Sequence, residues 1–258
     1  MQARPIIVAG RPLAGGRLPA VCAPLVGRTR DALLAEAAEV AAKQPDLLEW
    51  RVDFFDGIAD TQAVLATGVA LREAAGGIPL LFTRRSRREG GEPIEIDEPQ
   101  VVALCRAVCD SGFAALVDFE MDNAAEHIRE LRECSRAKGI GLVLSFHDFQ
   151  ATPSLEVLVG RFEQAQRLGA DVAKVAVMPR SPDDVLRLLQ ATSAASASLS
   201  IPVVSMSMAG LGAVSRLCGG VFGSALTFAV GRSASAPGQI PIDEVRAGLA
   251  ILAKASGS

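Results

Sequence analysis

Short apolar runs rich in β-branched residues recur along the whole chain and predict strands. The intervals between successive runs are 20 to 35 residues, which is about the length of one strand followed by one helix. We therefore expect eight strands in all. They begin near Val21, Asp46, Ile78, Phe113, Ile140, Asp171, Pro202 and Phe222.

Segments with the spacing of amphipathic helices lie between most of these runs. Leu33, Leu34, Ala37, Ala38 and Ala41 form one apolar stripe, and residues 181–184 (Ser-Pro-Asp-Asp) resemble a helix start. The strands at 141–145 and 171–177 are almost continuously apolar, as in a parallel sheet that is buried on both faces.

Eight such units without a break in composition predict a (β/α)8 TIM barrel, an α/β fold that the 258 residues fit. An open doubly wound sheet is the alternative. It more often carries a glycine-rich phosphate turn after its first strand, and residues 21–30 have none. We expect a single catalytic barrel domain over 1–258, with a strand-turn-strand appendage at 1–19.

Two other segments stand apart from the repeat. The serine- and alanine-rich run 191–200 predicts a frayed helix end and a surface linker. Residues 231–239 lie between the last strand and a final helix, and their glycines predict a lid.

The composition of the chain excludes or disfavours several structural and functional classes. With 50% hydrophobic and 21% charged residues the chain is not disordered. A net charge of -3 gives no general attraction to nucleic acid or to anionic membranes. Five scattered cysteines without a C-x-x-C pair predict neither a disulfide framework nor a zinc site, and they fit a reducing cytoplasm. No apolar stretch of about 18 residues occurs, so we expect neither export nor membrane insertion.

Catalytic groups of such barrels project from the carboxyl ends of the strands, and several predicted strands end in polar residues. Glu49, Arg51 and Asp53 alternate along the second strand, as binding groups or as a structural ion pair. The third strand runs into four arginines within 84–88, which are either solvated or part of an anion site. Nucleic-acid binding is disfavoured, because no aromatic residues interleave these arginines.

Lys174 lies within the apolar sixth strand. Burial favours its neutral amine, the form that a Schiff-base nucleophile requires. The alternative is a lysine neutralised by Glu49 or Asp118, with no covalent role. His147 ends the fifth strand, where an imidazole is suited to move protons or, alternatively, only packs. The second histidine, His127, is expected on a helix surface.

The neighbouring arginines disfavour a metal site, because they repel cations. The glycines of 205–216 predict a phosphate site. Alternatively, Arg216 binds a carboxylate through two parallel hydrogen bonds. Arg51, Arg85, Lys174 and Arg216 together make this end of the barrel cationic. The residues therefore predict a small anionic substrate that bears a carbonyl group.

Motifs along most of the chain resemble those of the type I 3-dehydroquinate dehydratase family. They are found, in order, at 24–29, 49–53, 81–85, 89–92, 145–149, 174–179, 205–208, 215–216, 222–225 and 235–239. The resemblance implies dehydration of 3-dehydroquinate to 3-dehydroshikimate and water in the shikimate pathway of aromatic amino acid biosynthesis, with no metal or organic cofactor. It also implies a cytoplasmic homodimer.

The resemblance assigns roles by motif position. Lys174 would form the imine, His147 would shuttle protons and Glu89 would orient that histidine. The implied substrate-binding residues are Glu49, Arg51, Arg85, Arg216, Ser235 and Gln239. The chain departs from the family at Pro24, where many members carry a serine. Two other readings are a class I aldolase-like Schiff-base barrel and a catalytically silent carboxylate-binding barrel.

Overall fold

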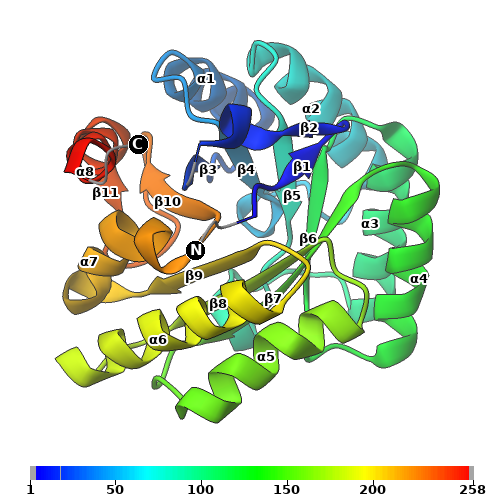
Figure 1. Cartoon of the computed structure of the whole chain (residues 1–258). Helices are drawn as coiled ribbons and strands as arrows, with labels where there is room; N and C mark the ends of the chain where they lie inside the picture. The colour runs from blue at the N-terminus through cyan, green and yellow to red at the C-terminus, as the bar shows by residue number, and fades with distance from the viewer. Residues whose placement is uncertain (1–3, 18, 256–258) are drawn as a thin grey trace.

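A curled parallel sheet forms the centre of the molecule and is surrounded by helices (Figure 1). The computed structural model describes residues 4–17 and 19–255. The sheet has the order β11-β10-β3-β4-β5-β6-β7-β8-β9. Its strands are β3 (Ala20–Leu25), β4 (Leu47–Arg51), β5 (Leu80–Thr83), β6 (Leu116–Glu120), β7 (Gly141–Asp148), β8 (Val172–Val177), β9 (Val203–Ser207), β10 (Leu226–Val230) and β11 (Ile240–Pro241).

Helices follow the barrel strands and cover the outside of the sheet. They are α1 (Arg30–Ala41), α2 (Thr61–Ala74), α3 (Glu98–Ser111), α4 (Ala125–Ala137), α5 (Leu155–Arg167), α6 (Pro182–Ser198), α7 (Ala209–Cys218) and α8 (Ile242–Ala255). Short 3-10 turns are η1 (Leu13–Gly16), η2 (Val52–Phe54), η3 (Arg87–Glu89) and η4 (Gly219–Phe222). Strands β3 to β10 alternate with helices as predicted, and the TIM-barrel prediction is confirmed.

The barrel closes where β9 meets the segment that leads into β10. Val203 and Ser224 form a parallel bridge, and the amide of Ala225 donates to the carbonyl of Val203 at 2.8 Å. The hydroxyl of Ser224 accepts a hydrogen bond from the amide of Ser205 at 3.1 Å and donates to the carbonyl of Leu226 at 3.0 Å. The hydroxyl of Ser224 thus adds hydrogen bonds to the backbone at the seam between β9 and β10, where the parallel pairing consists of an isolated bridge.

The N-terminal strand pair is confirmed as β1 (Ile7–Val8) and β2 (Arg11–Pro12), which pair antiparallel. Ile6 and Leu13 are buried against the first inward-facing residues of the strands, so this pair seals the amino end of the barrel. Residues 1–3, 18 and 256–258 of the expected domain lie outside the described residues.

Seven of the eight predicted strands begin within three residues of the expected positions, and the eighth begins later. Residues 219–222 form η4, and Gly223 then adopts a φ of 99°, so β10 starts at Leu226 rather than near Phe222. The buried face of α1 also differs in part from the apolar stripe that the sequence predicted. Leu33, Ala37 and Val40 face the core, whereas Ala38 is exposed.

The prediction for 191–200 was wrong, because α6 continues through this run to Ser198. Ala191 and Ala195 are fully buried, and the hydroxyl of Thr192 donates to that of Ser205 on β9 at 2.7 Å. Small side chains allow the helix to lie close to β9 and η4. At Gly223 an added Cβ would come within 2.4 Å of the Cβ of Ser196. The run is therefore a packing surface.

All five cysteines are free thiols, as the sequence predicts. None of the helices formed by the described residues has the length and apolar character needed to cross a membrane.

We predict that Ser224→Ala lowers the free energy of unfolding by about 1–3 kcal/mol, because the buried amide of Ser205 loses its acceptor. Urea denaturation measures the change. Ser198→Ala removes a hydroxyl from the exposed side of α6 and should stay within about 0.5 kcal/mol of the wild type. Equal losses in the two variants would contradict the role of Ser224 in closure.

Candidate active site

One cavity at the carboxyl end of the barrel brings all nine predicted site residues together. The space between its atoms, counted together with the open solvent at its mouth, is about 450 Å³. Its lining also includes side chains that the sequence did not single out, namely Phe149, Met206, Met208 and Phe228. The nine predicted residues are Glu49, Arg51, Arg85, Glu89, His147, Lys174, Arg216, Ser235 and Gln239.

Two-residue alternation along the strands explains how these side chains converge. On β8, Val172 belongs to the apolar cluster inside the barrel, and the same face continues with Lys174 and Ala176. On β7 the equivalent series starts at Val143 and ends at His147. The interior of the barrel is thus apolar near the amino ends of the strands and polar near their carboxyl ends. The inward-facing polar residues of this upper part are Glu49, Arg51, Thr83, Arg85, Asp118, Glu120, Ser145, His147 and Lys174.

The side chain of Lys174 lies inside this polar part and is paired with carboxylates. The residue is 4% exposed. Its Nζ lies 3.0 Å from Oδ2 of Asp118 and 3.5 Å from Oε1 of Glu49. The ring of Phe228 lies on another side of the amine, with its centroid 4.6 Å from Nζ. The neutralisation of Lys174 by these two carboxylates is therefore real, and it coexists with a position on the cavity wall.

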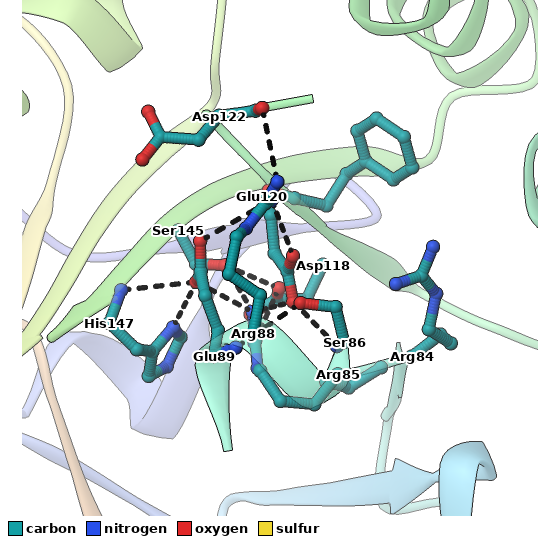
Figure 2. Close-up of polar contacts among 12 residues, drawn as sticks. Arg84, Arg85, Ser86, Arg88, Glu89, Asp118, Glu120, Asp122, Ser145 and His147 are labelled. Atoms are coloured by element: carbon teal, nitrogen blue, oxygen red, sulfur yellow. Dashed lines mark hydrogen bonds and ion pairs between the residues drawn. The ribbon is translucent and has the colours of Figure 1, made fainter. Parts of the chain in front are cut away.

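Arg85, which follows β5, connects two carboxylates of β6 to a hydroxyl of β7 (Figure 2). Its Nη2 lies 2.7 Å from Oδ1 of Asp118, and its Nη1 donates to the hydroxyl of Ser145 at 2.8 Å and to Glu120 at 3.3 Å. Burial alone would lower the pKa of the guanidinium, but Asp118 and Glu120 outweigh it and raise that pKa. Arg85 is therefore a permanent buried cation.

The other arginines of the 84–88 run point elsewhere. Arg84 pairs with Glu98 at the start of α3, and Arg88 is half exposed and reaches Oε2 of Glu120 at 3.1 Å. Neither of them lines the cavity, whereas Arg85 does. Arg85, the arginine of this run that the resemblance assigns to substrate binding, is therefore the one that lines the cavity.

Glu89 and His147 form a close pair on the wall of the cavity. Oε2 of Glu89 lies 2.8 Å from Nδ1 of His147 and also accepts the backbone amide of His147 at 3.1 Å. Burial and the nearby carboxylate of Glu120 raise the pKa of Glu89 to about 8. Burial and the cations of Arg85, Lys174 and Arg51 lower the pKa of His147 well below 6.5. The imidazole is thus held neutral, and its Nε2 is not engaged by Glu89.

Arg51 makes the ion pair that the alternating pattern suggested. Its Nε and Nη2 lie 2.8 and 2.7 Å from the two oxygens of Asp53. Asp53 also accepts the backbone amides of Arg85 and Glu92 and so connects β4 to the loop after β5. The Nη1 of Arg51 donates to the carbonyl of Ser235 at 3.3 Å, which places Arg51 under the 231–239 loop.

Arg216 is the cavity cation that lacks a carboxylate partner among the described residues. It is 1% exposed, and its Nη2 and Nη1 donate to the carbonyls of Pro237 at 3.1 Å and Phe228 at 3.4 Å. Burial lowers the pKa of its guanidinium to about 10, so it stays charged at neutral pH. Its Nε has no partner within residues 4–17 and 19–255. A buried cation in this state favours an anionic ligand.

The 231–239 loop covers the cavity. The amide of Ser235 donates to Oε1 of Gln239 at 3.0 Å, and Nε2 of Gln239 donates back to the hydroxyl at 3.4 Å. The carbonyl of Pro237 accepts both Arg216 and the amide of Ala209 at the start of α7. The loop is therefore attached to two sides of the barrel end.

Sequence reasoning named Asp118 only as a carboxylate that could neutralise Lys174, and it assigned no role to Glu120 and Ser145. The alternation that located Glu49 and Arg51 on β4 applies equally to Asp118 and Glu120 on β6, and was a usable signal.

Pro24 is buried opposite Glu49 in the β3–β4 register and is not part of the cavity lining. His127 lies partly buried on α4, away from the cavity. No group of three or more His, Cys, Asp or Glu side chains in the described part of the chain is placed to hold a metal ion.

Comparison with known proteins gives consistent matches over nearly the whole chain. A family model described as Type I 3-dehydroquinase matches residues 21–256. The 3-dehydroquinate dehydratase of Albidiferax ferrireducens is 55% identical, over 99% of this chain and 97% of its own. The crystal structure of 3-dehydroquinate dehydratase from Geobacillus kaustophilus has a TM-score of 0.94 at 52% identity, with 97% of each chain covered.

The type I enzyme from Clostridium difficile, solved with covalent modified comenic acid, has a TM-score of 0.92 at 39% identity and covers 98% of this chain and 99% of its own.

We predict that His147 titrates well below pH 6.5, because burial and three nearby cations disfavour its charged form. Since the folded-state pKa is depressed, the contribution of His147 to stability is present above the unfolded-state value and is lost as the pH falls. NMR titration of the imidazole resonances, assigned with His147→Asn, measures the midpoint. A midpoint at or above 6.5 would contradict the described environment.

Proposed function

The chain belongs to the type I 3-dehydroquinase family, and on this premise we propose that Lys174 is the amine that forms a Schiff base with the substrate. The activity is the dehydration of 3-dehydroquinate to 3-dehydroshikimate, a hydro-lyase reaction of the shikimate pathway. The observation that carries the proposal is a buried lysine on the wall of a cavity that also holds a neutral histidine and an arginine with no carboxylate partner among the described residues.

In the first step, Nζ of Lys174 bonds to the ketone carbon, and the ketone oxygen leaves as water. The resulting iminium withdraws electrons from the adjacent carbon and makes its C–H bond acidic. The relative from Clostridium difficile, solved with covalent modified comenic acid, supports covalent chemistry in a cavity of this family.

In the second step, His147 removes the proton from the carbon next to the iminium and returns a proton to the departing hydroxyl. A C–H bond and a C–O bond break, a C=C bond forms, and water leaves. The depressed pKa of His147 keeps it available as a base near neutral pH. Glu89 fixes the ring through Nδ1. When Glu89 is a carboxylate it accepts the hydrogen of Nδ1, and the lone pair of Nε2 is then free to take the proton. Hydrolysis of the product imine then restores Lys174.

Binding of the substrate is assigned to the cations and polar groups around Lys174. Arg216 would hold the carboxylate, because it is a buried charge that no carboxylate of the described residues compensates. Glu49, Arg51 and Arg85 would contact ring hydroxyls. Ser235 and Gln239 would contribute from the covering loop. The aldolase-like and catalytically silent readings are not favoured by the relatives.

We also propose that the whole chain is one catalytic domain, that it forms a homodimer and that it works in the cytoplasm. Exposed apolar side chains on consecutive helices support self-association, namely Leu186 on α6, Leu211 and Val214 on α7, and Ile251 on α8. The free cysteines support a reducing compartment.

For the assembly, we predict a dimer mass in light scattering coupled to size exclusion, because the exposed side chains would be covered between two copies. Val214→Glu should shift the protein toward the monomer, while the matched exposed change Val157→Glu on α5 should not. A monomer mass for the wild type at all concentrations would contradict the dimer.

For the reaction, we predict that the wild type converts 3-dehydroquinate to a conjugated enone, seen as ultraviolet absorbance. Borohydride added during turnover should leave one reduced adduct on Lys174, found by intact mass and peptide mapping. Lys174→Ala should lose both turnover and the adduct, whereas Lys138→Ala, which changes an exposed lysine at the carboxyl end of α4, should keep both. Stoichiometric labelling that persists in Lys174→Ala would remove Lys174 from its role.

A further inference from the structure

The mechanism above leaves one buried carboxylate beside the amine without a role, and that group is Asp118. The residue is 1% exposed. Its Oδ2 accepts from Nζ of Lys174 at 3.0 Å, while its Oδ1 accepts from Nη2 of Arg85 and from the hydroxyl of Ser145, each at 2.7 Å. Both oxygens are therefore fixed, and the one nearest the amine faces it directly.

The cations around Asp118 favour its charged form. Burial acts to raise its pKa, but Arg85 and Lys174 outweigh burial and lower that pKa to about 2. A carboxylate this acidic does not carry protons in a reaction near neutral pH, because it does not hold them. Its contribution has to be electrostatic.

Glu49, the second carboxylate near Lys174, is placed less favourably for the same task. It lies 3.5 Å from Nζ, and the oxygen concerned also accepts the hydroxyl of Thr83 at 3.0 Å. Asp118 is the closer partner, and its other oxygen, Oδ1, accepts hydrogen bonds from the guanidinium of Arg85 and the hydroxyl of Ser145.

The charge on the nitrogen is the same before and after the first covalent step. The ammonium of Lys174 and the ketone give an iminium and one water, because two of the three ammonium protons leave with the ketone oxygen. A fixed anion beside the nitrogen thus stabilises the iminium as it stabilised the ammonium. It opposes loss of the last proton, which would convert the iminium into a neutral imine that withdraws electrons poorly.

We propose, building on the assignment of Lys174 as the Schiff-base lysine, that Asp118 is the counter-ion that keeps the imine nitrogen protonated during dehydration. Arg85 and Ser145 hold this counter-ion in place. The role is distinct from that of His147, which moves protons, and from that of Arg216, which faces the substrate carboxylate.

Other charged and titratable groups lie in the cavity wall or interact with its charged side chains, and they also influence the charge on this nitrogen. The cations disfavour a protonated imine and the carboxylates favour it. From the strands and turns around the cavity these groups are Cys22 on β3, Glu49 and Arg51 on β4, Arg85 after β5, Glu89 on η3, Glu120 on β6, His147 on β7 and Arg216 on α7.

The deciding variant is Asp118→Asn, which keeps the shape of the side chain and removes its charge. We expect the alkaline limb of the kcat profile to move to lower pH by about 1–3 units, the size of effect that an opposite charge at this distance has on a titrating group. A structural disturbance alone would lower kcat at every pH and leave the limb where it is. Ser145→Ala, which loses a hydrogen bond to Asp118 but keeps the carboxylate, should lower kcat without moving the limb.

A second measurement uses the wild type and needs no variant to fold. Cyanoborohydride reduces protonated imines, whereas borohydride also reduces neutral ones. With Asp118 as counter-ion, the ratio of the adducts formed with the two reagents should stay constant from mildly acidic to mildly alkaline pH. A ratio that falls as the pH rises, or an alkaline limb in Asp118→Asn at the wild-type position, would overturn the inference.

The two measurements together distinguish a failure of the Schiff-base assignment of Lys174 from a failure of the counter-ion role of Asp118. If neither reagent gives an adduct with the wild type, the Schiff-base assignment of Lys174 fails, and the role of Asp118 fails with it. If the wild type forms the adduct and the pH profiles of wild type and Asp118→Asn coincide, only the counter-ion role is lost.

Discussion

The compensation of buried charge inside the upper half of the barrel is the constraint on which the rest of the structure depends. Arg85, Lys174 and Asp118 are almost fully buried, and each is within ion-pair distance of another member of the group. Removing one partner of a buried pair leaves an uncompensated charge, which costs about 3–5 kcal/mol. The strands that carry these residues must therefore keep their mutual register for the fold to be stable.

The barrel provides that register through its apolar layer and its closure. Below the charges, the strand residues that face inward are hydrophobic and pack with Ile6 and Leu13 of the N-terminal segment. Ser224 closes the seam between β9 and β10. Because alternate residues on each strand share a face, the same register that fills the lower layer places Lys174 beside Asp118 above it.

The cations of the cavity fall into two groups with different consequences. Arg51 and Arg85 are matched by carboxylates and hold the wall together, whereas Arg216 is held by backbone carbonyls and keeps its charge available for a ligand. His147 stands apart as a group kept neutral by burial among these cations. The arginines matched by carboxylates, the arginine held by carbonyls and the neutral imidazole thus have different partners, although they lie in one cavity.

The sequence by itself determined the barrel, because eight apolar runs at strand-plus-helix spacing leave few other arrangements. It also located the nine residues of the cavity, some at the ends of these runs and the others through the resemblance of their motifs to the family. Tertiary structure alone decided the partners: that Arg84 pairs with Glu98, that Asp118 joins Lys174 to Arg85, and that residues 191–198 pack as helix on β9. These outcomes depend on distances between strands and helices far apart in the chain, which closure of the barrel sets and local patterns do not contain.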